Sequence, residues 1–122
     1  MEPLFVIKTM ETAEDGFSAH VDCNPSHPIY KAHFPGNPIT PGACLLQTAG
    51  KILQQYIGRP LFLKNAKNIK YLNLLFPEEE KEIIFAYSHL METETECSVR
   101  LTIADASSVY SKMSLTFSYE PV

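Results

Sequence analysis

The stretch from residue 33 to residue 47, HFPGNPITPGACLLQ, constrains this chain more than any other part of it. Its first ten residues hold three prolines and two glycines, so the backbone path is tightly fixed before it enters an apolar run with helical spacing. A histidine, His33, stands at the entry to this path. Such a segment is suited to presenting backbone N–H groups and one imidazole to a ligand.

Thr40, Pro41 and Gly42 predict how the helix begins. The Thr40 hydroxyl is a good N-cap acceptor, and Pro41 suits the first helical position because no N–H is needed there. The Gly42 N–H is then left without an intrahelical partner, at the positive end of the helix dipole. Because glycine has no side chain to block an approach, this amide can stabilise a carbonyl oxygen that gains negative charge. The alternative is a capped helix with a rigid lead-in loop and no chemistry.

Residues His33 to Gly42 resemble, position by position, the signature of the hot-dog-fold 3-hydroxyacyl-ACP dehydratases. The resemblance implies that His33 acts as general base or acid at C2 of a 3-hydroxyacyl thioester, and that the Gly42 N–H polarises the thioester carbonyl. It implies a substrate carried on the phosphopantetheine arm of an acyl carrier protein (ACP), with no cofactor. It also implies a homodimer or a higher homo-oligomer, because in this family the histidine of one subunit works with an acidic residue of its partner.

The chain departs from this family at Gln47, the position of the acidic residue. A glutamine side chain can orient a hydroxyl or a water molecule, but it cannot ionise. Lys51 lies four residues later on the same helix face, where the family often has a polar amide. In one interpretation Lys51 is desolvated and handles protons in place of the acid; in the other it extends into solvent. Four residues are predicted to bind the substrate: Phe34, Pro41, Cys44 and Lys51.

The three cysteines, Cys23, Cys44 and Cys97, lie far apart in apolar patterns. This spacing favours small buried side chains over metal ligands, and the histidines also lack ligand spacing, so no metal site is expected. Cys44 differs from the other two because it falls in the first helical turn, where the helix dipole can lower a thiol pKa.

Apolar periodicity predicts one α+β domain over residues 1–122. Helical spacing runs from Thr40 to about Ile57 and ends at Gly58 and Pro60. Period-two alternation predicts an antiparallel sheet with two strands before the helix and four after it, near residues 4–11, 17–23, 67–75, 83–87, 97–103 and 113–119. The resemblance adds that this sheet wraps around the helix as a hot-dog fold.

Charge and hydropathy narrow the partners and the location. No acidic residue lies between Asp22 and Glu78, although six basic residues do: Lys31, Lys51, Arg59, Lys64, Lys67 and Lys70. This basic part suits an anionic partner such as ACP, unless it is only a solvated face. The net charge of −4 and the lack of an aromatic–basic motif argue against nucleic acid. No signal sequence or membrane span is recognisable, so a cytoplasmic location is expected.

Three functions fit these residues. In the first, a dehydratase of fatty acid or polyene biosynthesis, His33 removes the C2 proton, Gly42 stabilises the enolate and Gln47 holds the departing hydroxyl. The second is thioester hydrolysis, with Gln47 or His33 orienting water. The third is a non-catalytic subunit that binds acyl chains. The dehydratase is favoured because His33 and Gly42, which the chemistry needs, are both present.

Overall fold

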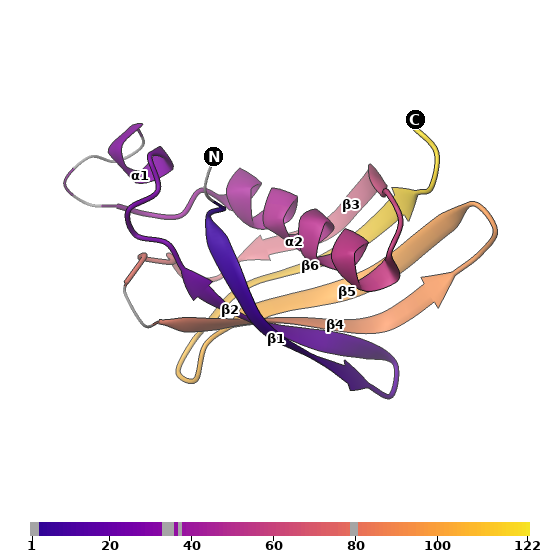
Figure 1. Cartoon of the computed structure of the whole chain (residues 1–122), viewed down its shortest axis with the longest axis horizontal. Helices are drawn as coiled ribbons and strands as arrows, with labels where there is room; N and C mark the ends of the chain where they lie inside the picture. Colours follow the sequence, from indigo (N-terminus) through magenta and orange to yellow (C-terminus); the bar gives the residue numbers. More distant parts are fainter. Residues whose placement is uncertain (1–2, 33–35, 37, 79–80) are drawn as a thin grey trace.

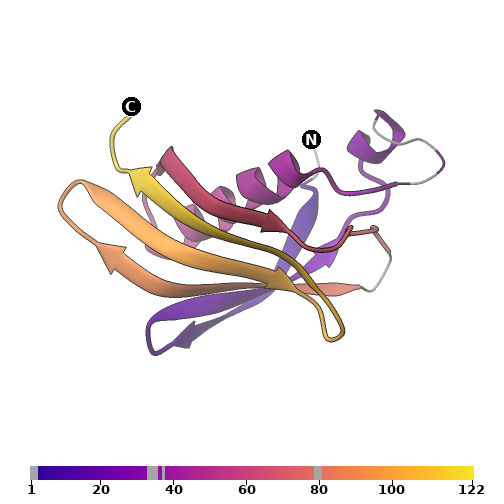
Figure 2. The ribbon, with the colours of Figure 1, turned by 180° about the vertical axis from the view of Figure 1, so that it is seen from behind.

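The structure is a computed structural model that describes residues 3–32, 36, 38–78 and 81–122. The described residues form a curved antiparallel sheet with one long helix across one of its faces (Figures 1 and 2). The elements follow in the predicted order: β1 (Phe5–Ala13), β2 (Gly16–Cys23), α1 (Ile29–Ala32), α2 (Gly42–Ile57), β3 (Phe62–Tyr71), β4 (Glu82–Glu92), β5 (Glu96–Ala104) and β6 (Val109–Ser118). The predicted α+β architecture is therefore confirmed.

The strand order is β1-β2-β4-β5-β6-β3, and every neighbouring pair is antiparallel. β2 and β3 are consecutive strands along the chain, yet β3 lies at the far edge of the sheet. The segment that joins them, which contains α2, therefore crosses the whole sheet (Figure 1). This crossing leaves β1 and β3 as the two edge strands.

The core lies between α2 and the sheet, and it fixes how the helix is rotated. The Tyr87 ring stacks on Phe17, which stacks in turn on Tyr56 of the helix, and the Tyr87 hydroxyl donates a 2.7 Å hydrogen bond to the Ala49 carbonyl. Each buried large side chain contributes about 1.5–3 kcal/mol. The buried helical residues recur at helical spacing: Leu45, Ala49, Ile52 and Leu53. No helix in the described ranges is long and apolar enough to cross a membrane.

Strand β3 differs from its prediction, because it spans Phe62–Tyr71 and not the region near 67–75. Its pairing with β6 sets these limits, since Phe62 lies opposite Ser118 and Tyr71 opposite Ser111. Several residues beyond Tyr71 are apolar but exposed, and they lie outside this ladder. Apolar composition alone therefore misplaced this strand.

Candidate functional site at the start of helix α2

Helix α2 begins one residue later than predicted, and the assignments of Thr40 as N-cap and Pro41 as first helical residue are both wrong. Pro41 is the N-cap residue, in an extended conformation with φ −62° and ψ 143°. The hydroxyl of Thr40 is engaged elsewhere, in a buried 2.8 Å hydrogen bond with the Tyr30 hydroxyl. The Thr40 N–H donates to the Leu75 carbonyl at 2.8 Å. The helix start is thus fixed by α1 and by the segment after β3, not by a local cap.

Gly42 is the first residue of α2, and its N–H has no hydrogen-bond partner within the described chain. The ring of Tyr71, the last residue of β3, packs against it: a Cβ on residue 42 would lie 2.6–2.8 Å from atoms of that ring and its hydroxyl. Only glycine allows this approach without displacing Tyr71. Sequence reasoning missed Tyr71, because the contact joins two elements that no local pattern relates.

His33 and Phe34 lie outside the described residues, so their roles stay predictions. The described residues on both sides of them are tied together, since Tyr30 of α1 holds Thr40 before α2. Gly36 has φ +82°, a left-handed conformation that favours glycine, with no atom near the position of a Cβ. The lead-in to the helix is therefore anchored at its two described ends.

Cys44, Gln47 and Lys51 share one face of α2 and form a ridge between two grooves. The β1 groove, about 730 Å³, lies between the helix and Leu4–Ile7 of the first strand region. The β3 groove, about 500 Å³, lies on the other flank, where Leu61, Leu63 and Phe117 line it. All three ridge residues line both grooves. Pro41 and Gly42 line neither groove. The start of the helix is therefore separate from the ridge, which begins at Cys44.

No carboxylate lines either groove among the residues that the structure describes. The acid that Gln47 replaces is therefore not supplied by another described position of the same chain. Lys51 is exposed, which agrees with its extending into solvent in the single chain. His27, to which sequence reasoning gave no role, lines the β1 groove. Its Nδ1 accepts a 3.0 Å hydrogen bond from the Ile29 N–H, which leaves the proton of the neutral ring on Nε2.

The cysteines follow the prediction in two cases of three. Cys23 and Cys97 are buried, and burial raises the pKa of the Cys97 thiol to about 11. Cys44 is only partly buried, and the expectation of a lowered thiol pKa is wrong, because desolvation raises its pKa. Across the described positions, no group of three metal-binding side chains is gathered. Cys44 thus contributes an uncharged thiol to the ridge.

An antiparallel sheet wrapped around one helix is the hot-dog fold, which dehydratases and thioesterases share. The family model described as ApeI dehydratase matches residues 9–117, and the chain belongs to this ApeI-like dehydratase family.

Solved structures with the same fold include proteins of both activities. The dehydratase heterocomplex ApeI:P from Xenorhabdus doucetiae has a TM-score of 0.74 at 15% identity, over 97% of this chain and 99% of that one. A hypothetical thioesterase protein with coenzyme A from Streptococcus pneumoniae TIGR4 has a TM-score of 0.64 at 14% identity, over 95% and 85% of the two chains. At these identities the likeness concerns the fold alone.

A curated relative is the 3-hydroxyacyl-[acyl-carrier-protein] dehydratase FabZ of Latilactobacillus sakei subsp. sakei (strain 23K). It is 29% identical over an alignment of 90 residues and covers 66% of this chain. The match spans 64% of that relative's length.

Proposed function

We propose that this protein dehydrates 3-hydroxyacyl thioesters carried on an acyl carrier protein to trans-2-enoyl thioesters, in cytoplasmic fatty acid or polyene biosynthesis. The observation that carries the proposal is the start of α2, where Gly42 offers an unpartnered N–H at the positive end of a 16-residue helix. Membership of the ApeI-like dehydratase family supports the same class of reaction.

In the proposed reaction, the imidazole of His33 takes the proton from C2 of the substrate. The electron pair moves onto the thioester carbonyl, and the Gly42 N–H stabilises the enolate oxygen. The electrons then return to form the C2–C3 double bond while the C3 hydroxyl departs. Gln47 on the ridge orients that hydroxyl through its side-chain amide.

The departing hydroxyl needs one proton to leave as water, and this chain offers two sources. His33 can return the proton that it took from C2, which balances the reaction without a further acid. Lys51, one turn from Gln47 on the same ridge, is the other source. Lys51 is exposed in the single chain, which favours His33 acting twice over proton transfer from Lys51.

We further propose that the active unit is a homodimer in which His33 of one subunit faces Gln47 of the other. Seven of the ten exposed large hydrophobic side chains in the described ranges lie between residues 62 and 76, in and after edge strand β3. Exposed apolar surface of this extent on an unpaired edge favours association with a second subunit.

A second function is favoured by one observation, the neutral side chain at position 47. Without an acid, the chain can serve as a non-catalytic subunit that binds acyl groups along the two grooves. A solved structural relative is a heterocomplex, which is compatible with such a role. Thioester hydrolysis is the third hypothesis. It releases a free acid, which neither a dehydratase nor a non-catalytic subunit produces.

The test incubates the purified protein with a 3-hydroxyacyl-ACP and identifies the acyl product by mass. We expect an enoyl thioester, and we expect His33→Ala to lower its rate by about two to four orders of magnitude. An unchanged rate in His33→Ala contradicts the mechanism, and release of free acid assigns hydrolysis.

Gln47 separates the enzyme from the non-catalytic subunit. Gln47→Glu restores the acid, and pairing it with Lys51→Gln prevents an ion pair from capturing the new carboxylate. We expect the wild type to form the enoyl thioester, and we expect the double variant to form it at least as fast. Activity only in the double variant makes the natural protein a non-catalytic subunit. Gln55→Glu adds the same charge two turns further along the β1 groove, and it tests whether the position of the carboxylate matters.

A further inference from the structure

A third groove lies on the outer face of the sheet, the face that turns away from α2. It has a volume of about 510 Å³ and crosses β3, β6, β5 and β4. One basic side chain from each strand lines it: Lys70, Lys112, Arg100 and His89. The hydroxyls of Thr102 and Ser114 lie among them, and the described lining contains no carboxylate. We call this feature the basic groove.

The basic side chains of this groove lie close to one another. Lys70 and Lys112 lie directly opposite across β3 and β6, an arrangement that destabilises an antiparallel pair when both residues carry the same charge. Nη1 of Arg100 donates a 3.4 Å hydrogen bond to Nε2 of His89, and Nδ1 of that ring lies 3.8 Å from a carboxylate oxygen of Asp15, so the cations of the groove are Lys70, Lys112 and Arg100. Within the described chain, Lys70, Lys112 and Arg100 form no ion pair. An anionic partner would relieve this unbalanced charge.

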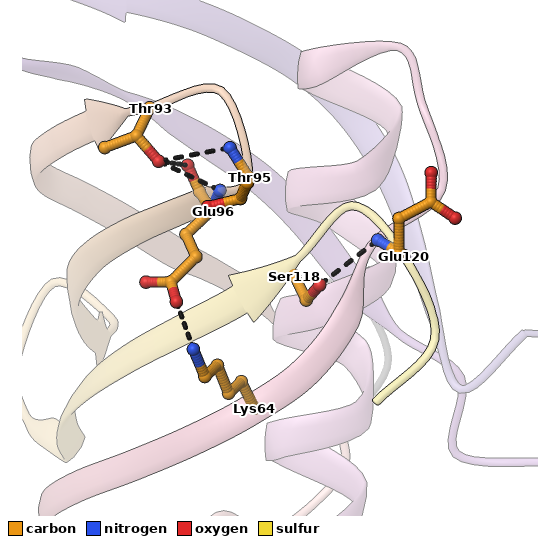
Figure 3. Close-up of polar contacts among 6 residues, drawn as sticks. All are labelled: Lys64, Thr93, Thr95, Glu96, Ser118 and Glu120. Atoms are coloured by element: carbon orange, nitrogen blue, oxygen red, sulfur yellow. Dashed lines mark hydrogen bonds and ion pairs between the residues drawn. The ribbon is translucent and has the colours of Figure 1, made fainter.

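Two other lysines of the sheet, Lys64 and Lys8, are neutralised within the chain. Lys64, at the other end of β3, forms an ion pair with Glu96 (Figure 3). Lys8 on β1 lies 3.0 Å from Glu82. The chain carries a net charge of −4, so carboxylates are plentiful, yet none of them lines the basic groove in the described structure. The concentration of positive charge is therefore local.

Protection of an exposed edge does not explain the groove. Lysines on an edge strand discourage unwanted strand pairing, and this accounts for Lys70 on β3. Lys112 and Arg100, however, lie on β6 and β5, which are paired on both sides. Their side chains have no edge to protect.

We infer that the basic groove docks the acidic helical face of the acyl carrier protein, an inference that rests on the proposed function. The three cations, Lys70, Lys112 and Arg100, lie on three neighbouring strands and span roughly 10 Å at the usual strand spacing. About two turns of an α-helix cover this length, and acidic residues three or four apart on it would meet successive cations.

The position of the groove also suits delivery of an acyl chain. Lys70 lines the groove, and the next residue, Tyr71, ends β3 with its ring against Gly42. The end of β3 therefore connects the basic groove with the start of α2, because neighbouring residues of this strand line the one and contact the other. Of the six basic residues between Asp22 and Glu78, only Lys70 lines the groove. Arg100 and Lys112 come from the acidic part of the sequence, so the docking surface is assembled by the fold.

The first experiment measures binding of the carrier protein without its prosthetic group, by calorimetric titration. The variant Arg100→Gln with Lys112→Gln should weaken binding roughly tenfold, and the loss should shrink at high salt because the contact is electrostatic. Lys8→Gln with Lys64→Gln removes the same charge outside the groove and should leave binding unchanged. Thermal unfolding serves as a check, since removing like charges should keep or raise Tm.

The second experiment compares turnover of one 3-hydroxyacyl group carried on ACP and on free pantetheine. The groove variant should raise KM for the carrier-bound substrate only. If both variants bind the unmodified carrier like the wild type, or if the groove binds inorganic phosphate but not that carrier, the docking surface is refuted. Groove-dependent binding without any turnover refutes the dehydratase and leaves the docking surface standing. If the groove variant turns over the carrier-bound substrate like the wild type, the dehydratase stands and the docking surface is refuted.

Discussion

The two edge strands of the sheet differ in what they present to solvent. β1 exposes one large hydrophobic side chain in its described length, Val6, and an ionic cluster around Lys8 lies beside it. Both edges have irregular registers with their neighbouring strands, since β1 shifts once, between Ile7 and Thr9, and β3 shifts twice, so it is the exposed side chains that distinguish the two edges. Edge β3 carries lysines and asparagines along its middle, but it exposes large apolar side chains at both of its ends and in the segment that follows: Phe62, Leu63, Ile69, Tyr71, Leu72, Leu74 and Phe76.

This contrast indicates which side of the molecule is built to be covered. Single exposed apolar residues such as Val6 are ordinary, whereas five exposed large apolar side chains within the eight residues from Ile69 to Phe76 are not. β3 also reaches the candidate site, because Tyr71 packs against Gly42 and Leu63 lines the β3 groove. Association through β3 therefore changes the surroundings of the site, while β1 is expected to stay outside the interface.

The largest expected effect is on assembly. Ile69→Lys places a charge on the exposed apolar edge, where its side chain is 38% exposed in the single chain. If a second subunit covers this edge, the lysine is buried without a partner, and the dimer dissociation constant should rise by at least about a hundredfold. Light scattering at micromolar concentration should then report the monomer mass, with a dimer for the wild type.

Val6→Lys is the matched control, because Val6 is 51% exposed on the opposite edge. It should leave the mass unchanged. A monomeric wild type would rule out the dimer. Dissociation by Val6→Lys and not by Ile69→Lys would place the interface at β1.

The sequence predicts the order of the elements well, because alternation and helical spacing are local. The prediction fails where contacts with residues distant in the sequence determine the limits of an element or the pKa of a side chain. The start of α2 moved because the hydroxyl of Thr40 is held by Tyr30, and β3 moved because its pairing with β6 sets its limits. The thiol pKa of Cys44 rose with burial, which depends on packing across the helix. The basic groove escaped detection for the same reason, since Arg100 and Lys112 meet Lys70 only in the folded sheet.

A smaller effect is expected where β3 touches the helix start. Gly42→Ala keeps the N–H but adds a Cβ within 2.8 Å of the Tyr71 ring, so the ring must move and the approach to the amide narrows. We expect kcat/KM for the dehydration to fall by about tenfold to a hundredfold, short of the loss on removing an oxyanion donor outright. Steady-state kinetics on a carrier-bound substrate measures it.

Tyr71→Ala distinguishes the two causes of this loss. If displacement of the ring is responsible, Tyr71→Ala alone lowers kcat/KM as much, and the combined variant loses nothing further. If the added Cβ blocks the substrate directly, Tyr71→Ala alone has little effect and the combined variant stays as slow as Gly42→Ala. Full activity in Gly42→Ala would show that neither the position of the Tyr71 ring nor the space beside residue 42 limits the approach of the substrate to the amide.

The smallest expected effect concerns the ionic cluster around Lys8 beside edge β1, and how its contribution to stability changes at low pH. Hydrogen bonds from His20 at 2.8 Å and from Lys8 at 3.0 Å hold the pKa of the Glu82 carboxyl below its usual range. A carboxyl with a lowered pKa in the folded state stabilises the fold fully above its unfolded value, about 4.3, and loses that contribution as the pH falls through the folded pKa.

Wild-type stability should therefore decline more steeply below about pH 5 than that of Glu82→Gln, which lacks the titrating group. The difference should be small, because the cluster is exposed to solvent and screened by salt. Urea unfolding between about pH 6 and 3 measures it, with Glu94→Gln, which changes a carboxyl at the β4–β5 turn, as control. Light scattering over the same range should show an unchanged mass, because the apolar β3 edge carries none of these groups. If the molecular mass fell as Glu82 became protonated, the ionic cluster beside β1, and not β3, would lie in the interface.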